Sequence, residues 1–281
     1  MIEVCGQCGG NLKIDDKGYK CTCCGVRYES LEELHPERRS YQNNFDPYKT
    51  SGKTAYQSAV PTAYSNVEQH DNGVDVFDNN IKAVLEISWT DEKSLHSGSG
   101  FLVSREGYAI TNTHVVTYED GRSCGRVNVK ICGQGVKADV ISLGDNLHGS
   151  GNGVDLALIK LSQVPSDAVT VTFEDFNNVR NGERVFVIGN SLGYGTCITS
   201  GIVSDRSRTV DGERLLMTDC AVNGGNSGGP VFNEGGRVIG AIVSGISGAE
   251  GMNFAIPADT VINFMKENYM SPAQYSVATC F

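Results

Sequence analysis

Between residues 83 and 256 the chain repeats one pattern, in which a short apolar run rich in Val, Ile, Leu and Phe is followed by Gly, Asn or Asp. Runs of this length and composition predict β-strands, and the residues that separate them favour turns. We therefore expect an all-β sandwich or barrel in this part of the chain. The predicted strands are residues 83–89, 100–104, 109–112, 127–131, 136–143, 156–161, 184–188, 198–205, 215–218, 231–233, 238–244 and 252–256.

A single amphipathic helix is predicted after the last of these strands, over residues 259–270. Its apolar residues recur with the spacing of one helical face, so the helix is expected to pack on neighbouring strands. These residues are Val261, Ile262, Phe264 and Met265.

A glycine-rich stretch within this region, residues 223–230, has the sequence NGGNSGGP and contains one serine, Ser227. The glycines allow a tight turn and a close approach of the backbone to a substrate. Taken alone, the stretch is equally consistent with an ordinary hairpin loop. If Ser227 is a nucleophile, the amides of Gly225 and Ser227 can point together at the oxygen of a carbonyl under attack, which is an oxyanion hole.

A serine hydroxyl becomes an effective nucleophile only when a histidine takes its proton and a carboxylate orients that histidine. His114 follows a pair of apolar runs, and Asp155 opens the apolar run DLALIKL. The order along the chain is His, Asp, Ser. The sequence therefore predicts a catalytic triad of His114, Asp155 and Ser227.

Five segments together resemble the chymotrypsin-like serine proteases, and within them the HtrA/Deg branch. They are GSGFLV from residue 98, TNTHV from residue 111, DLALIK from residue 155, GNSGGP from residue 225 and NFAIP from residue 253. The resemblance covers about residues 79–270 and implies two six-stranded antiparallel β-barrels with the triad in the cleft between them. It also implies a serine endopeptidase that needs no catalytic cofactor. No region of the length of a PDZ module follows.

The same resemblance indicates where the substrate side chain before the scissile bond binds. The pocket floor is expected at Ala221, six residues before the serine, and its wall at Ser244, Gly245 and Ile246. Ala221 is not an acid that would demand Arg or Lys, and Ile246 narrows the pocket. We therefore expect cleavage after small or medium apolar residues.

The ten cysteines are unevenly distributed, with five in the first 24 residues. The pairs Cys5-x2-Cys8 and Cys21-x2-Cys24 are spaced so that four thiolates can surround a structural zinc ion. Cys23 competes with Cys24 as the fourth ligand. The alternative is that one CxxC pair acts as a redox dithiol. The sequence favours a structural zinc site that resembles a zinc ribbon.

Composition divides the chain into four parts. Residues 1–34 form the predicted ribbon, and residues 35–78 are rich in Ser, Asn, Asp, Gln, Tyr and Lys, which predicts a polar flexible linker. Residues 79–270 are the predicted protease domain, and residues 271–281 a C-terminal tail. Within the ribbon two short strands are expected, at residues 12–14 and 19–20.

The net charge of −10 argues against a general nucleic-acid binder or a binder of anionic membranes. The N-terminal residues lack the features of a secretory signal, and no stretch is long enough to span a bilayer, so we expect a cytoplasmic protein. The remaining cysteines are then expected to be reduced. They are Cys124, Cys132, Cys197, Cys220 and Cys280. His96 and His148, in polar glycine-containing stretches, are interpreted as solvated loop residues.

The leading functional hypothesis is a serine endopeptidase acting on proteins or peptides, with the ribbon recruiting a substrate or a protein partner. One alternative is a binding or chaperone-like module on a protease scaffold, which would require a missing triad member. Another is esterase or acyl-transfer chemistry on the same triad.

Overall fold

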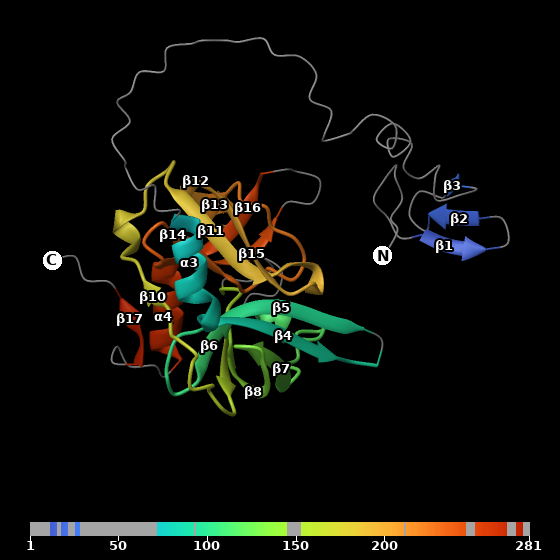
Figure 1. The fold of residues 1–281 in the computed structure, drawn as a ribbon, viewed down its shortest axis with the longest axis horizontal. Coiled ribbons are helices and arrows are strands. Elements are labelled where there is room, and N and C mark those ends of the chain that lie inside the picture. The colour runs from blue at the N-terminus through green and yellow to red at the C-terminus, as the bar shows by residue number, and fades with distance from the viewer. Residues whose placement is uncertain are drawn as a thin grey trace, which may run out of the picture. The chain divides into compact units, whose positions relative to one another are not determined.

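The computed structural model describes residues 12–15, 18–21, 26–28, 72–92, 94–144, 153–210, 212–245, 251–268 and 274–277 of the 281-residue chain. The chain divides into two compact units, residues 1–67 and residues 68–281 (Figure 1). Within the described ranges no helix is both long and apolar enough to cross a membrane.

The described part of the first unit is a small antiparallel sheet. Its strands are β1 (Leu12–Asp15), β2 (Gly18–Cys21) and β3 (Arg27–Tyr28), in the order β1-β2-β3 (Figure 1). The predicted hairpin is confirmed, because β1 pairs with β2 from Leu12 opposite Cys21 to Asp15 opposite Gly18. The two-residue strand β3 was not predicted.

The first barrel of the second unit closes through six strands in the order β4-β5-β6-β9-β8-β7. Its walls alternate between inside and outside, so Val127, Val129 and Ile131 of β7 are buried while the residues between them are exposed. The strands are β4 (Val84–Thr90), β5 (Leu95–Leu102), β6 (Tyr108–Thr111), β7 (Arg126–Ile131), β8 (Gln134–Leu143) and β9 (Ala157–Leu161).

The second barrel has the strand order β14-β11-β12-β13-β16-β15 and closes through the pairing of β14 with β15. The prediction of two six-stranded antiparallel barrels is thus confirmed. Two short strands, β10 (Thr172–Phe173) and β17 (Ser276–Val277), extend this sheet in parallel pairing. The barrel strands are β11 (Arg184–Asn190), β12 (Thr196–Val210), β13 (Glu213–Thr218), β14 (Pro230–Asn233), β15 (Val238–Gly245) and β16 (Asn253–Pro257).

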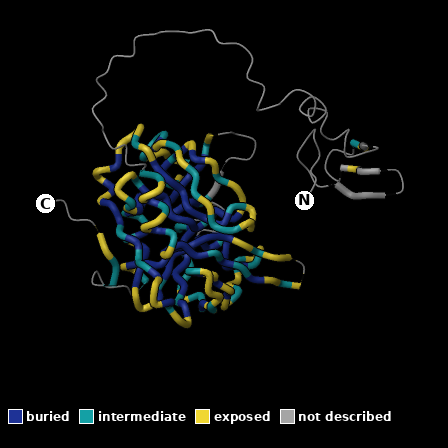
Figure 2. The backbone as a smooth tube through the Cα atoms, viewed as in Figure 1, coloured by how far each residue is buried: buried dark blue, intermediate teal, exposed yellow. Residues whose placement is uncertain are grey.

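The core follows from this arrangement. Figure 2 shows buried residues concentrated along the barrel strands, with exposed residues at the turns. Large apolar side chains fill the interior of the second unit, including Phe101, Phe173, Phe186 and Phe232. The described residues also include four short 3-10 helices. The first, η1 (Ile81–Ala83), directly precedes β4, and the others lie between strands: η2 (Thr113–Val115), η3 (Phe176–Asn178) and η4 (Ser191–Gly193).

The predicted C-terminal helix is present as α4 (Ala258–Glu267). It buries Val261, Phe264 and Met265 in the core that includes the second barrel. The helix ends earlier than predicted because Asn268 caps it: the Asn268 N–H donates to the carbonyls of Phe264 and Met265.

Helix α3 (Asn72–Asn80) occupies the last residues of the region predicted as a linker, so the folded unit begins before residue 79. Its composition is polar, yet Val76 is buried and Phe77 packs against the same core. The Asn80 side chain, also buried, donates to the Val76 carbonyl at 2.9 Å. Two apolar side chains were too few to show as a periodic pattern in the sequence.

Candidate active site

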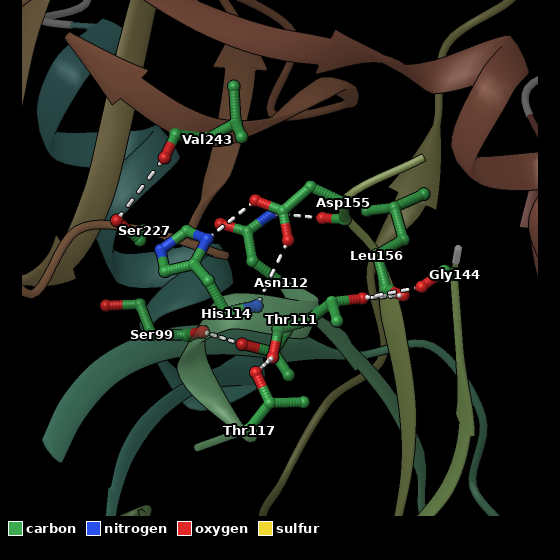
Figure 3. Close-up of polar contacts among 11 residues, drawn as sticks. Ser99, Thr111, Asn112, His114, Thr117, Gly144, Asp155, Leu156, Ser227 and Val243 are labelled. Carbon is green, nitrogen blue, oxygen red and sulfur yellow. Dashed lines mark hydrogen bonds and ion pairs between the residues drawn. The ribbon is translucent and has the colours of Figure 1, made fainter. Parts of the chain in front are cut away.

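Both barrels contribute to the candidate site. In the first barrel, His114 lies in η2, directly after β6, and Asp155 lies two residues before β9. In the second barrel, Ser227 lies in the loop between β13 and β14. Figure 3 draws the His114 imidazole between the Asp155 carboxylate and the Ser227 side chain.

The histidine and the aspartate form a tight pair. His114 Nδ1 lies 2.6 Å from Asp155 Oδ2, and the His114 backbone N–H donates to Asp155 Oδ1 at 3.1 Å. Asp155 is buried, with 6% of its surface exposed. An ionised carboxylate only accepts hydrogen bonds, so the proton of the neutral imidazole is on Nδ1. Nε2 is then the ring nitrogen that carries no proton.

Two buried side chains next to His114 hold the segment that contains Asp155. Asn112 Nδ2 donates to the Asp155 carbonyl at 2.7 Å, and Thr113 Oγ1 donates to the Leu156 carbonyl at 2.7 Å (Figure 3). These bonds fix η2 against the start of β9. Neither Asn112 nor Thr113 was predicted to have a role of its own, although both lie in the TNTHV segment.

The loop that carries Ser227 is fixed to β15. The Gly228 N–H donates to the Ile242 carbonyl at 2.7 Å, and the Ile242 N–H donates to the Gly229 carbonyl at 2.8 Å. The Ser227 hydroxyl itself donates to the Val243 carbonyl at 3.5 Å (Figure 3). A hydrogen bond of this length is weak, so the hydroxyl can exchange it for another acceptor.

The geometry around Gly225 determines where its N–H points. The Leu192 N–H donates to the Gly224 carbonyl at 2.7 Å. In a trans peptide the N–H points away from the carbonyl, so the Gly225 N–H faces the opposite direction from Leu192. Gly225 has a φ of 94°, and a Cβ there would collide with the Asn190 carbonyl, so only glycine fits. Among the described residues the N–H groups of Gly225 and Ser227 have no acceptor.

Ser99 connects the two barrels behind this loop. Its Oγ donates to the Gly225 carbonyl at 2.7 Å and accepts from the Asn190 N–H at 2.8 Å. Its backbone N–H donates to the Ser227 carbonyl at 2.8 Å. Ser99 is fully buried. From the sequence the GSGFLV segment was interpreted only as a family feature, and the strand predicted there began at Gly100, directly after Ser99.

The residues predicted for the substrate pocket are only partly described. Ala221 is exposed, and its carbonyl accepts from Thr199 Oγ1 at 2.9 Å. The backbones of Ser244 and Gly245 form the end of β15, directly after the Val243 carbonyl that contacts Ser227. Ile246 lies outside the described residues.

The predicted zinc ligands Cys5, Cys8 and Cys24, together with Cys23, lie outside the described residues, and Cys21 ends β2. The part of the chain that the structure describes contains no group of three or more His, Cys, Asp or Glu that could hold a metal ion.

Four cysteines of the second unit are free thiols: Cys124, Cys132, Cys197 and Cys220. Burial raises the pKa of the Cys220 thiol to about 11. Cys220 therefore stays protonated near neutral pH and is a poor candidate for a nucleophile.

His96 is not the solvated loop residue that was predicted. It lies in β5 and is half-buried, because its ring stacks on Trp89 with centroids 4.0 Å apart. Its Nε2 lies 3.0 Å from Asp91 Oδ2. The prediction was wrong because the contacts come from Trp89 on the neighbouring strand β4 and from Asp91 in the turn, while the local sequence is polar. His148 lies outside the described residues.

The chain matches the family model of the trypsin-like peptidase domain over residues 98–240. This range contains His114, Asp155 and Ser227. The chain belongs to the trypsin-like peptidase family.

Its relatives within this family are of Deg type. The probable periplasmic serine endoprotease DegP-like of Brucella suis is 39% identical over 175 residues, which is 60% of this chain and 32% of the relative. The protein with the same name from Rickettsia conorii is 38% identical over 192 residues, covering 64% of this chain and 35% of the relative. The chain spans about a third of the length of these curated relatives.

Solved structures of HtrA-type proteases share the fold. The HtrA-type protease AlgW with a tripeptide superposes with a TM-score of 0.60 at 27% identity, covering 69% of this chain and 62% of that chain. The serine endoprotease from Yersinia pestis gives a TM-score of 0.58 at 26% identity, covering 75% of this chain and 68% of that chain. These comparisons agree with the HtrA/Deg resemblance of the sequence motifs.

The prediction of a cytoplasmic location is wrong, because the relatives from Brucella, Rickettsia and Rhizobium are named as periplasmic proteins. The prediction relied on N-terminal residues that lack the features of a secretory signal and on the lack of a stretch long enough to span a bilayer.

Proposed function

We propose that the chain is a serine endopeptidase that hydrolyses peptide bonds through His114, Asp155 and Ser227. The observation that carries this proposal is the 2.6 Å contact between His114 Nδ1 and Asp155 Oδ2. Because this contact turns Nε2 of the same imidazole toward the Ser227 side, it supplies an oriented base for a serine on the facing barrel.

Each of these residues then has a defined role in peptide-bond hydrolysis. Nε2 of His114 takes the proton of the Ser227 hydroxyl as Oγ bonds to the carbonyl carbon of the substrate. The amides of Gly225 and Ser227 donate to the oxygen that becomes negative. His114 then gives the proton to the leaving amine as the carbon–nitrogen bond breaks. Water then attacks the carbonyl carbon of the acyl-enzyme while His114 takes a proton from it. The ester bond to Ser227 Oγ breaks as His114 returns the proton to Oγ, which releases the acid and restores Ser227.

One backbone hydrogen bond and one side-chain hydrogen bond support the positioning of the proposed oxyanion hole. The Leu192 bond to the Gly224 carbonyl and the Ser99 bond to the Gly225 carbonyl hold the two peptides on either side of Gly225. Donors that are fixed before the reaction need no reorganisation in the transition state, which is the main source of their catalytic effect.

The substrate pocket proposed for this enzyme takes small or medium apolar residues. Ala221 supplies no negative charge, and Ser244 and Gly245 lie on the strand that passes Ser227. An extended substrate can pair with the backbone of this strand. Proteins or peptides with an exposed, extended apolar segment are therefore the proposed substrates.

The first unit is proposed to be a zinc ribbon with Cys5, Cys8, Cys21 and Cys24 as ligands. The hairpin β1–β2 supports this proposal, because Cys21 ends the second strand at the position where a ligand pair would follow. Zinc there would be structural. We propose that this unit binds a protein partner or substrate.

Labelling with a fluorophosphonate probe tests the catalytic proposal. The probe reacts only with an activated serine, so we expect one label per chain, located on Ser227 by mass spectrometry. Ser227→Ala should remove the label while circular dichroism stays unchanged. Labelling that persists in Ser227→Ala, or a folded wild type that is not labelled, would contradict the proposed triad.

A further inference from the structure

Trp89 lies near the end of β4 and is buried, with 4% of its surface exposed. Its indole Nε1–H donates to the Val115 carbonyl at 2.8 Å. A buried indole N–H needs an acceptor, and here the acceptor belongs to η2. Because Val115 directly follows His114 in the chain, this bond ties the wall of the first barrel to the backbone of the proposed general base.

The helix η2 is a single 3-10 turn of three residues. Turns of this kind have poor hydrogen-bond geometry, so contacts from outside decide how they are oriented. At the start of η2, the side chains of Asn112 and Thr113 bind the segment that carries Asp155. At its end, the Val115 carbonyl accepts from Trp89, and the described residues offer it no other donor. The proposed general base therefore lies between two anchors.

Val115 contacts both strands of the β4–β5 hairpin. On β5, Gly98 lies so close that an added Cβ would come within 2.5 Å of the Val115 side chain. Glycine is therefore needed at this position for the strand to pack directly against Val115. The side chain of Val115 is held by β5 and its carbonyl by β4, so a rotation of η2 would disturb both contacts.

The indole ring of Trp89 is itself held on several sides. The His96 ring stacks on it with centroids 4.0 Å apart, and the Tyr118 ring meets it edge-on with centroids 4.9 Å apart. Asp91 Oδ2 lies 3.0 Å from His96 Nε2 and keeps that imidazole in place. Stacked and edge-on aromatic contacts favour a fixed geometry. Trp89 can therefore hold the Val115 carbonyl in position before a substrate binds.

Two sets of contacts determine the direction of the His114 ring. Its Nδ1 lies 2.6 Å from Asp155 Oδ2 and its backbone N–H donates to Oδ1, which ties the residue to Asp155 on one side. The Val115 carbonyl, held by the indole, fixes the backbone on the other side. Since Figure 3 draws the ring between Asp155 and Ser227, a tilt of η2 would change the distance from the ring to Ser227. A misplacement of about 1 Å can lower a rate by roughly a hundredfold.

We propose that Trp89 is a positioning residue for His114. Through its hydrogen bond to the Val115 carbonyl it fixes the rotation of η2, and with it the direction in which Nε2 of His114 faces Ser227. This role rests on the proposed endopeptidase function, in which His114 is the general base. It adds to that function a side chain on β4 that acts through the backbone of the base.

Two variants at Trp89 test the proposal. Replacement by 3-benzothienylalanine through codon suppression puts a sulfur atom in place of the N–H and keeps the ring that stacks on His96. Trp89→Phe removes the N–H together with the second ring. For both variants we expect kcat on an internally quenched peptide to fall about tenfold while KM stays within about twofold. A base tilted away from Ser227 weakens the transition state without changing how the substrate binds.

The rate is expressed per active site, so that a loss of folded protein does not lower kcat. Active sites are counted by complete reaction with a fluorophosphonate. Asn80→Ala is the matched control, since the buried Asn80 side chain likewise donates to one backbone carbonyl, that of Val76 in α3. This control should lower the resistance to unfolding by urea and leave kcat per active site unchanged.

A second measurement does not depend on turnover. The Nδ1 proton of His114, in the 2.6 Å contact with Asp155, should give a proton resonance far downfield in the NMR spectrum. Asn80→Ala should leave this resonance as it is in the wild type. The benzothienylalanine variant should broaden it, because a loosely held η2 lets the proton exchange faster with water.

An unchanged kcat per active site in the benzothienylalanine variant would leave the proposed function standing and reject the role of Trp89. An equal fall of kcat in Asn80→Ala would also overturn that role, since any lost buried hydrogen bond would then have the same effect. If the wild type neither cleaves peptides nor reacts with the fluorophosphonate, the proposed function fails. The resonance of the His114 proton then decides alone, and an unchanged signal in the benzothienylalanine variant rejects the positioning role.

Discussion

Ser99 shows how much of the site depends on single buried side chains that never touch a substrate. It takes part in four hydrogen bonds, to Ser227, Gly225, Asn190 and Thr111. The bonds to Gly225 and Asn190 join residues 126 and 91 positions apart. It is therefore a positioning residue for the loop that holds both the proposed nucleophile, Ser227, and the proposed oxyanion donors.

Replacing Ser99 by Ala should reduce both stability and turnover. The substitution leaves the Gly225 carbonyl and the Asn190 N–H buried without a partner, at a cost of about 1–3 kcal/mol. Because the oxyanion donors act in the transition state, kcat should fall more than KM changes. Urea unfolding and peptide kinetics measure both effects. Ser207→Ala, at an exposed position, is the control and should change neither. An unaltered kcat in Ser99→Ala would remove its positioning role.

A comparison of Ser99 with the proposed triad shows which residues of the site could be predicted from the sequence. His114, Asp155 and Ser227 each lie in a short segment whose local pattern indicates chemistry, so they could be assigned before the fold was known. Ser99 and Leu192 act through partners that only the closed barrels bring near. Nothing in their neighbouring residues indicates those partners, because the contacts depend on how the two barrels meet.

At the scale of elements, Glu174 joins the end of β10 to the turn between β14 and β15. This buried carboxylate accepts from Asn178 at 3.1 Å, Asn233 at 3.0 Å and Arg237 at 3.2 Å. Burial raises the pKa of Glu174, but the hydrogen bonds of Asn178, Arg237 and Asn233 lower it more, so its pKa lies below the usual 4.5. The strand β10, two residues long, was missed in the sequence because it is held by this cluster and not by a pattern of its own.

Glu174→Gln should lower the free energy of unfolding by about 1–3 kcal/mol at neutral pH, since the charged acceptor is lost. A lowered pKa in the folded state means that the carboxylate stabilises the fold above pH 4.5, and that this contribution is lost as the pH falls through the folded-state value. The difference between wild type and variant should therefore shrink in acid. Urea unfolding at a series of pH values measures it, with exposed Glu119→Gln as the control. A difference independent of pH would show that the charge of Glu174 has no role.

At the scale of the whole molecule, the second unit contains every element of the candidate site. The residues of the proposed triad, the proposed oxyanion donors and the barrel cores all lie within residues 68–281. The sequence predicted this unit well because its strands are short, apolar and separated by clear turn residues. It misplaced the start of the unit, because α3 contributes only a few side chains to the core.

Deleting residues 1–67 should leave the hydrolysis of short peptides within about twofold of the full chain, since the remaining unit has its own core. If the first unit recruits substrate, cleavage of a protein substrate should fall by a larger factor, because a second binding site raises the local concentration. An equal loss on peptide and protein would mean that residues 1–67 support the catalytic fold rather than recruitment.

Elemental analysis of the full chain, purified without chelator, should find about one zinc per chain. The variant that lacks residues 1–67 should contain none. A full chain that holds no zinc would contradict the proposed ribbon and its four cysteine ligands.

The most direct test of the account is kcat/KM for an internally quenched peptide with an apolar residue before the scissile bond, measured for wild type and Ser227→Ala. We predict that the wild type cleaves the peptide at that bond and that Ser227→Ala lowers kcat/KM by at least about a thousandfold, because the acyl-enzyme cannot form. The two proteins should have the same circular dichroism spectrum. Undiminished cleavage by folded Ser227→Ala would contradict the central claim that Ser227 is the nucleophile.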